Sequence, residues 1–383
     1  MSSSDHLDDF SLYVHFPWCI RKCPYCDFNS HELKGEIDED RYINTLLRDF
    51  DSSIGVFNPR SIKSIFLGGG TPSLFSGNSL GDLITYVRER INCHKDMEVT
   101  LEANPGTLEH DQFERYLDAG ITRLSLGVQS LDDHSLTRIG RIHQAETALV
   151  ALENARRSGF RNINIDMMFG LPDQTLKMAI QDCEGAIACD TEHISYYQLT
   201  LEPNTLFYLN PPLLADHDQI YRMQTQIHSL LHDHGYIQYE VSAHAKRGMQ
   251  CKHNLHYWNF GDYLGIGAGA HSKIMTDGIV HRIWNEKHPK HYQDKVAKNA
   301  SWKNREPIHR DNLVIEFMMN TLRIKEGFRL DLFEQRTLLN QQELLNHAQI
   351  FCEEGLLILE NNHLRCTEQG YLFIDEIIER MIL

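Results

Sequence analysis

The sequence predicts an α/β protein built on a partial (β/α)6 TIM-like barrel, followed by a smaller α+β domain that is winged-helix-like. Two observations predict the barrel. Short apolar runs alternate with helical patterns along the first half of the chain, as expected of parallel strands joined by crossover helices. Polar residues follow several of these runs, and the loops after the strands form the active face of such barrels. A third observation, two helical patterns before a hairpin pattern near the C-terminus, predicts the second domain.

Six apolar runs are candidate strands, and amphipathic helices are predicted between them. Apolar residues recur every three or four positions in 38–50, 80–91 and 145–158, which is the spacing of one helical face. Gly159 ends the third helix, as glycine often does. A full barrel has eight units, so six units predict a partial one. The candidate strands are 12–16, 62–67, 98–102, 123–128, 162–168 and 193–199.

The middle of the chain is less regular. A break lies near 204–218, where prolines gather, and a helix is predicted over 219–234. An extended run, 236–244, follows it. Residues 246–306 are rich in glycine, histidine and aromatic residues, and their periodicity is weak.

The C-terminal domain is predicted from two helices, 313–322 and 338–354, and a hairpin. The hairpin joins 356–360 to 364–366 through Asn361-Asn362, a typical turn sequence. We therefore divide the chain into an N-terminal tail (1–10), the barrel core (11–235), a connecting region (236–306) and the C-terminal domain (307–383).

Composition argues against several classes of protein. The chain has 383 residues with 37 basic and 53 acidic side chains, which gives a net charge of −16. A surface this acidic repels phosphate backbones and argues against nucleic-acid binding as the main function. No apolar run reaches the ~18 residues of a membrane span, and the polar N-terminus is unlike a signal peptide. We therefore expect a cytoplasmic protein without an integral membrane segment.

A tight cysteine cluster indicates metal or redox chemistry in the reducing cytosol. Cys19, Cys23 and Cys26 have the spacing C-x-x-x-C-x-x-C directly after the first strand. Structural zinc sites generally use four ligands, whereas three thiolates in one loop suit three corners of a 4Fe–4S cube. The fourth iron is then open to a chelating ligand, and Arg21 and Lys22 favour the thiolate form. A zinc-binding loop, or three unrelated cysteines, is the alternative.

This spacing is similar to that of the radical S-adenosylmethionine (SAM) superfamily. In that superfamily the amino and carboxylate groups of SAM bind the open iron, and an electron from the cluster cleaves SAM to a 5′-deoxyadenosyl radical. The resemblance implies a 4Fe–4S cluster and SAM as cofactors. The cofactor carries the difficult chemistry and the protein positions it.

Residues at successive strand ends are candidates for the SAM site. Gly68-Gly69-Gly70-Thr71-Pro72 closes the second strand, and glycines let a backbone approach a ligand closely. This turn lacks the Lys-Ser/Thr ending of a P-loop. Asp166 lies within an apolar strand, where a carboxylate must be paired or ligand-bound. If the barrel forms, these residues share one pocket with Glu102, Gln129 and Arg141, which end or follow other strands.

The chain resembles the oxygen-independent coproporphyrinogen III dehydrogenase family, which includes HemN and HemW. The resemblance is carried by L-Y-V-H-F-P-W-C (12–19), C-P-Y-C-D-F (23–28), G-G-G-T-P (68–72), S-L-G-V-Q-S (125–130) and N-I-D-M-M-F-G-L-P (164–172). It implies a radical SAM core with a HemN-like C-terminal domain. It also implies cluster ligation by Cys19, Cys23 and Cys26, and SAM contacts from Tyr13, Gly69, Gly70, Thr71, Glu102, Gln129, Arg141 and Asp166.

One residue departs from the dehydrogenase pattern. The true dehydrogenases have a further cysteine two residues after the cluster motif, where this chain has Phe28. The ending C-D-F-N-S instead resembles the heme chaperone branch, HemW, which binds heme and passes it to acceptor proteins, including respiratory enzymes. The alternative is an oxygen-independent coproporphyrinogen III dehydrogenase, which converts coproporphyrinogen III to protoporphyrinogen IX by radical SAM chemistry. Whether the protein is an enzyme stays open at this point.

A further motif concerns heme as cargo. H-N-L-H-Y-W at 253–258 matches the H-N-x-x-Y-W motif associated with heme binding in this family. A neutral imidazole such as that of His253 is a common axial ligand of heme iron, and Tyr257 and Trp258 offer an apolar wall for a porphyrin. His256 and Cys251 are alternative ligands.

A glycine-rich segment, G-I-G-A-G-A at 265–270, fits the relaxed dinucleotide fingerprint. No clear βαβ unit with an acidic residue about 20 positions later accompanies it, so we interpret it as a tight loop packed near the pocket. The heme acceptor, the cleavage of SAM and the oligomeric state stay open, although the family resemblance suggests that a homodimer can form.

Overall fold

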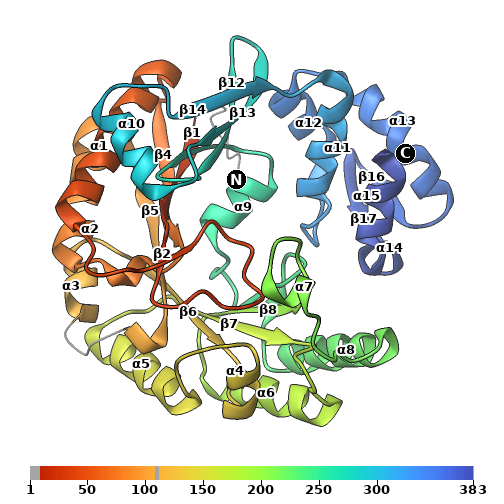
Figure 1. Cartoon of the computed structure of the whole chain (residues 1–383). Coiled ribbons are helices and arrows are strands. Elements are labelled where there is room, and N and C mark those ends of the chain that lie inside the picture. The colour runs from red at the N-terminus through yellow and green to blue at the C-terminus, as the bar shows by residue number, and fades with distance from the viewer. Residues whose placement is uncertain (1–8, 108–111, 383) are drawn as a thin grey trace.

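The computed structural model describes residues 9–107 and 112–382, and its centre is one curved sheet of twelve strands (Figure 1). The strand order is β14-β13-β12-β11-β1-β4-β5-β6-β7-β8-β10-β9. Neighbours from β1 to β8 are parallel, so the six predicted strands are confirmed. Their bounds are β1 (Asp9–Phe16), β4 (Ser61–Gly69), β5 (Asn92–Ala103), β6 (Arg123–Gln129), β7 (Ile163–Phe169) and β8 (His193–Gln198).

Helices cover the outer face of the sheet, where Figure 1 shows them as a ring around the strands. The three predicted helices are confirmed, and each begins or ends where the sequence provides a cap. The Asp38 carboxylate accepts from the Arg41 amide, and Gly159 ends its helix at a φ of 112°, which glycine adopts without strain. The helix bounds are α1 (Glu39–Phe57), α2 (Gly77–Arg90), α3 (Gln112–Asp118), α4 (Asp133–Arg138), α5 (Ala145–Ser158), α6 (Leu176–Ala188), α7 (Leu206–Leu209) and α8 (His217–Asp233).

The region predicted to connect the two domains adds strands to both edges of the core sheet. β11 pairs with β1 in parallel, and β10 pairs with β8 antiparallel. The extended run predicted over 236–244 overlaps β9 and β10, whereas the strands from β11 onward were not predicted because their periodicity is weak. The elements are β9 (Ile237–Gln238), β10 (Ala243–Ala245), α9 (Lys252–Trp258), β11 (Asp262–Ile266), β12 (His271–Thr276), β13 (Ile279–Asn285), α10 (Pro289–Ala297) and β14 (Lys303–Pro307).

The sheet stays open, as expected of a partial barrel, because β14 and β9 lie at opposite ends of the strand order. Helix α9 lies inside the curve of the sheet (Figure 1), where it contacts β1, β4 and β11. The C-terminal domain approaches the same open side, because α11 contacts α9. The heme motif is therefore on an internal helix rather than on a surface loop.

The C-terminal domain has its own apolar core, in which Phe317, Phe333 and Phe351 are buried. The predicted hairpin is confirmed, and both turn residues adopt positive φ. The helix predicted over 338–354 begins only at Gln341, because Leu338 is left-handed and ends a separate helix, α12. The elements are α11 (Arg310–Thr321), β15 (Phe328–Arg329), α12 (Leu330–Thr337), α13 (Gln341–Glu353), β16 (Leu357–Glu360), β17 (His363–Cys366), α14 (Glu368–Leu372) and α15 (Ile374–Ile382).

Two broader expectations concern membranes and disulfides. In the described ranges, no helix has the length and apolar character needed to cross a bilayer. All nine cysteines are free thiols. The cysteine cluster is therefore available for other chemistry.

Buried neutral histidines make the fold sensitive to acid. The ring of His244 on β10 is 1% exposed, and neither of its nitrogens has a hydrogen-bond partner among the described residues. Burial lowers the pKa of His244 to about 3, and the nearby His228 adds to this effect. Unfolded histidine titrates near 6.5, so folding stability is complete above that pH and is lost as the pH falls below it.

We predict that replacing His244 by Leu reduces this acid sensitivity. Between pH 7.5 and 5.5 the wild type should lose about 1.4 kcal/mol more unfolding free energy than His244→Leu, since that is the contribution of one such histidine at pH 5.5. Urea unfolding at the two pH values measures the difference. Equal losses in both proteins would show that His244 is not protonated on unfolding in this range.

Candidate functional site

A cavity of about 430 Å³ opens at the carboxyl ends of the parallel strands β1 and β4 to β8. It collects most of the residues singled out in the sequence, because parallel strands bring their ends to one edge of a sheet. Tyr13 and the heme motif are not in its lining. The predicted residues that line it are Cys19, Cys23, Cys26, Gly69, Gly70, Thr71, Glu102, Gln129, Arg141 and Asp166.

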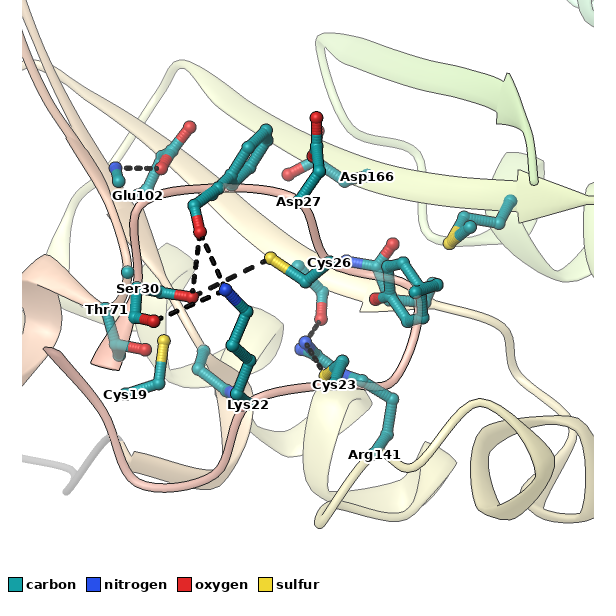
Figure 2. A pocket seen from close by; sticks show the side chains of 18 of the residues that line it. Cys19, Lys22, Cys23, Cys26, Asp27, Ser30, Thr71, Glu102, Arg141 and Asp166 are labelled. Atoms are coloured by element: carbon teal, nitrogen blue, oxygen red, sulfur yellow. Dashed lines mark hydrogen bonds between the residues drawn. The ribbon is translucent and has the colours of Figure 1, made fainter. Parts of the chain in front are cut away.

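The three cysteines lie on one loop, which we define as the cluster loop (residues 20–30 with the adjoining Cys19). The loop is closed at its base by two short parallel strands, β2 (Trp18–Cys19) and β3 (His31–Glu32). Within it, the Lys22 ammonium donates to the Phe28 and Ser30 carbonyl oxygens at 2.9 and 3.4 Å. Figure 2 shows the three cysteines on this loop, with Arg141 against Cys23 and Ser30 beside Cys26. The loop therefore has a defined shape in the protein itself.

The surroundings of the thiols favour their binding to a cation. Burial raises the pKa of Cys19 and of Cys26, and neighbouring thiols raise it further. Donors partly offset this cost: the Ser30 hydroxyl lies 3.9 Å from the Cys26 sulfur, and Arg141 Nη1 donates to the Cys23 sulfur at 3.8 Å. Iron binding stabilises thiolates directly, so a cluster suits a set of partly buried thiols with donors around them.

The thiols do not surround a single point. Among the residues that the structure describes, no three His, Cys, Asp or Glu side chains converge as ligands of one metal ion. A four-iron cluster does not need such convergence, because each thiolate binds a different iron atom. Ligation of a cluster by these three thiols therefore stays a prediction from the spacing.

Two half-buried carboxyl groups, those of Glu102 and Asp166, line the cavity. Glu102 Oε2 accepts from the Gly69 amide at 3.0 Å, and Asp166 accepts from Ser125 and Asn164 at 3.1 and 2.9 Å. Burial raises the pKa of Glu102 to about 8, and the charge of Asp166 raises it as well. Burial also raises the pKa of Asp166, against the effect of its hydrogen bonds. The Glu102 carboxyl is thus largely protonated at neutral pH until a ligand favours its ionised form.

Gln129 and Arg141 form the wall opposite the glycine turn. Gln129 has a φ of 73°, which is unusual for a residue other than glycine, and its amide oxygen accepts from the Tyr197 hydroxyl at 2.7 Å. Arg141 Nη2 donates to the Gly127 carbonyl oxygen at 2.5 Å. Strained backbone of this kind is concentrated at functional sites. Both side chains are therefore held in place before any ligand binds.

Tyr13 lies near these carboxyl groups but not in the cavity lining. Its hydroxyl donates to His15 Nδ1 at 2.9 Å, and its ring stacks on Phe66 with centroids 6.3 Å apart. Burial, and then the charge of Glu102, raise the pKa of Tyr13. Tyr13 is therefore close enough to feel the charge of Glu102, and its side chain packs on Phe66 and His15.

The heme motif forms a separate group on α9. The ring of His253 is 5.0 Å from Phe66, and its Nδ1 is 3.0 Å from the Ser64 hydroxyl. His253 is only 8% exposed, and burial lowers its pKa to about 3, so it is neutral. The rings of Tyr257 and Trp258 pack edge to face with their centroids 4.6 Å apart, and both residues are partly exposed. The structure thus brings the cluster and SAM candidates together but keeps the heme candidates on the other side of Phe66.

The two alternative heme ligands are also buried. His256 Nε2 lies 2.8 Å from the Asp262 carbonyl oxygen, and His256 is 8% exposed. The Cys251 thiol donates to Glu98, and burial raises its pKa to about 12. Cys251 is therefore a thiol at neutral pH, which is not the form that binds iron.

Sequence reasoning missed several residues that shape the site. Lys22 was expected only to favour thiolates, but it also braces the cluster loop. Asn164 connects Ser125 and Asp166 to the next strand, where its amide oxygen accepts from the Ser195 amide at 3.0 Å. Polarity within an apolar run was the available signal for Asn164. No local signal marks Tyr197, whose contact with Gln129 depends on the pairing of distant strands.

Comparisons with known proteins agree with this geometry. A family model of the radical SAM superfamily matches residues 13–184, and a model of the HemN C-terminal domain matches residues 308–373. The chain is 44% identical to the heme chaperone HemW of Haemophilus influenzae and 43% identical to that of Escherichia coli, over 97% of this chain and 98% of each relative. The solved structure of E. coli coproporphyrinogen III oxidase (HemN) has a TM-score of 0.81 at 22% identity, over 97% of this chain and 90% of that one. That likeness shows the fold alone.

We predict that Gly70→Ala lowers stability, because the glycine turn is packed against the base of the cluster loop. A Cβ at Gly70 would lie 2.5 Å from the Trp18 carbonyl oxygen, and overpacking of this kind typically costs about 1–3 kcal/mol. Urea unfolding measures the loss. Gly55→Ala on α1 is the matched control, since no atom lies within 4 Å of its added methyl group and alanine favours helix by about 1 kcal/mol. A Gly70→Ala protein as stable as the wild type would contradict the packing described here.

Proposed function

The chain belongs to the HemW family of heme chaperones, and we propose that it holds a 4Fe–4S cluster and SAM in the cavity, binds heme and transfers it to an acceptor protein. The observation that carries this proposal is the cavity itself, in which three free thiols face the glycine turn and the strand-end side chains. Phe28 supports the chaperone function over the dehydrogenase, because it stands 57% exposed at this cavity where a dehydrogenase has a cysteine.

Cys19, Cys23 and Cys26 would hold the cluster, which when bound supplies an electron for reductive chemistry on SAM. The protein's own residues set its environment. Arg141 donates toward the Cys23 sulfur and the Ser30 hydroxyl lies beside that of Cys26, and hydrogen bonds to sulfur tune the potential of such clusters. Lys22 keeps the loop in its folded shape.

SAM would lie between the glycine turn and the two carboxyl groups. Gly69, Gly70 and Thr71 line one side, and the family resemblance assigns the methionine amino group to this turn. Glu102, Gln129, Arg141 and Asp166 provide polar groups on the other sides, and Tyr13 lies close enough to feel the charge of Glu102. The two carboxyl groups suit a cationic ligand, because a positive charge between them favours their ionised forms.

Heme would bind at α9. His253 is the proposed axial ligand, with Tyr257 and Trp258 as the apolar wall. His253 is neutral here, which is the form that binds iron. His253 is buried against Ser64 and Phe66 of β4, so heme iron reaches it only if α9 moves away from β4. A cytoplasmic location, delivery to respiratory enzymes and a homodimer complete the proposal, and these rest on the family resemblance and the composition.

We predict that the purified protein binds heme and that His253→Ala weakens this binding by at least about tenfold, since about 1.4 kcal/mol or more is lost with the iron–nitrogen bond. Absorption titration with hemin measures it, and transfer to an apo heme protein is followed in the same spectrum. His256→Ala is the matched control, because it removes an equally buried imidazole from the same helix.

Unchanged heme affinity and spectrum in His253→Ala would overturn the ligand assignment. The chaperone function itself is tested by incubating the reconstituted protein anaerobically with SAM, a reductant and coproporphyrinogen III. We expect that no protoporphyrinogen IX forms although the cluster of the protein is intact. Catalytic formation of protoporphyrinogen IX, measured by mass spectrometry, would instead establish a dehydrogenase.

We predict that SAM binding strengthens with pH up to about 8. A protonated Glu102 must lose its proton to hold SAM as a carboxylate, so affinity should rise by about tenfold per pH unit below the pKa of about 8 and then level off. Calorimetry at pH 6.5, 7.5 and 8.5 measures it. Glu102→Gln should bind SAM more weakly and should not show this rise of affinity with pH. Glu202→Gln, which changes another residue of the same cavity, should keep the rise. Equal slopes in the wild type and Glu102→Gln would contradict the assignment.

A further inference from the structure

Two sequence motifs have no part in the function proposed above, and the structure brings them together. One is Asn29, in the C-D-F-N-S ending of the cysteine motif, and the other is the glycine loop (residues 265–270) between β11 and β12. We propose that Asn29 is a positioning residue that clamps the cluster loop to the glycine loop and so sets the distance between the cluster thiols and the SAM-binding turn. The inference rests on the proposed cluster and SAM site.

Asn29 uses both N–H groups of its side-chain amide in this clamp. Its Nδ2 donates to the Ala268 and Lys287 carbonyl oxygens, each at 2.9 Å. These partners lie on the glycine loop and just before α10, so one side chain ties the cluster loop to two distant segments. Asn29 follows Cys26 by three residues and adjoins Ser30, whose hydroxyl lies beside the Cys26 sulfur. Any shift of Asn29 therefore reaches the cluster ligands through a short stretch of chain.

The glycines are required for this approach. A Cβ at Gly269 would overlap the Asn29 amide nitrogen, and one at Gly267 would overlap the His15 carbonyl oxygen. Both residues also have positive φ, 77° and 104°, which glycine adopts without strain. The pattern that resembles a dinucleotide fingerprint thus lets the backbone approach the cluster loop. The prediction of a tight loop packed near the pocket is confirmed.

The glycine loop is itself held firmly. The fully buried Asp49 carboxylate on α1 accepts from the Gly267 amide at 3.1 Å and from the Tyr292 hydroxyl at 2.6 Å. Asn285 Nδ2 donates to the same carboxylate at 2.9 Å, and the Lys303 ammonium lies 2.6 Å from its other oxygen. A charge buried with this many partners stabilises one arrangement of its surroundings. Asn29 therefore docks on a rigid platform.

His15 connects the clamp to the SAM-binding turn. Its Nε2 donates to the Asn29 carbonyl oxygen at 2.9 Å, and a Cβ at Gly69 would lie 2.6 Å from the same imidazole ring. The ring therefore touches the glycine turn on one side and the cluster loop on the other. In the proposed site SAM must reach both the open iron and this turn. A misplacement of about 1 Å between reacting groups can lower a reaction rate about 100-fold.

The test uses the full-length protein with a reconstituted cluster. Asn29→Ala leaves all three thiols in place, so iron content should stay near that of the wild type. Its SAM affinity should fall about tenfold or more, because two hydrogen bonds that fix the cluster loop are lost. Addition of SAM should also cause a smaller change in the electron paramagnetic resonance spectrum of the reduced cluster than it does in the wild type. Asn29→Asp, of equal size, should lose at least as much, because its carboxylate faces two carbonyl oxygens. Asn29→Asp with wild-type affinity would overturn the donor role.

Gly269→Ala tests the clamp from its other side while keeping Asn29. Its methyl group displaces the Asn29 amide, so SAM affinity should fall as in Asn29→Ala. Gly248→Ala is the matched control, because Gly248 also has positive φ but no atom lies within 4 Å of the added carbon. In the double variant Asn29→Ala/Gly269→Ala, the loss of SAM affinity should be smaller than the product of the two single-variant losses. The methyl group at residue 269 then has no Asn29 amide to displace.

Two further results would overturn the inference. One is SAM affinity within about twofold of the wild type, with the same spectral change, in both Asn29→Ala and Gly269→Ala. The other is a double variant whose losses multiply. If Asn29→Ala loses iron, the SAM affinity of Gly269→Ala decides whether the clamp matters, because that variant retains every polar group of the clamp. If the wild type itself holds no cluster or binds no SAM, the proposed function fails, and the inference fails with it.

Discussion

The pairing of β1 on both of its edges is the constraint on which the rest of this structure depends. β1 lies between β4 and β11, both parallel to it, so its carboxyl end is held by hydrogen bonds on either side. The cluster loop leaves β1 at that end, and the glycine turn leaves β4 beside it. Parallel pairing therefore brings the thiols and the turn together, and the Thr71 side chain hydrogen-bonds to the Cys19 thiol. A glycine loop follows β11 at the same edge and provides the surface on which the cluster loop rests.

Burial then determines the chemistry of this edge. Cys19, Cys26, Glu102 and Asp166 are largely shielded from water, which disfavours their charged forms and raises their pKa values. The protein offsets only part of this cost with donors from Ser30, Arg141, Asn164 and Gly69. In the function proposed here, a cluster and a cationic ligand would provide the remaining stabilisation. The polar groups of the site are held in place by their hydrogen bonds before any ligand binds.

Phe66 lies between the glycine turn of the cavity and His253 of the heme motif. On one side a Cβ at Gly68 would meet its ring at 2.9 Å, and on the other the His253 ring lies 5.0 Å away. The cavity proposed for SAM and the heme motif are therefore neighbours in the barrel interior, although they share no lining residue. This arrangement places α9 between the core sheet and the C-terminal domain, which contacts it through α11. Movement of α9 would affect both sides of Phe66.

The sequence alone determined the six parallel strands, their crossover helices, the three-thiol loop and the strand-end residues, because each depends on local periodicity or on short spacing. It also indicated the family and the departure at Phe28, which are properties of contiguous motifs. Only the tertiary structure decided that residues 236–306 extend the sheet, that His253 is buried against β4, and that Asn29 meets Gly269. Those contacts join segments far apart in the chain, and their energy comes from the pairing of β11 with β1 and from the buried Asp49 network. No local pattern in either partner encodes such a contact, since it exists only when both segments have folded onto the same sheet.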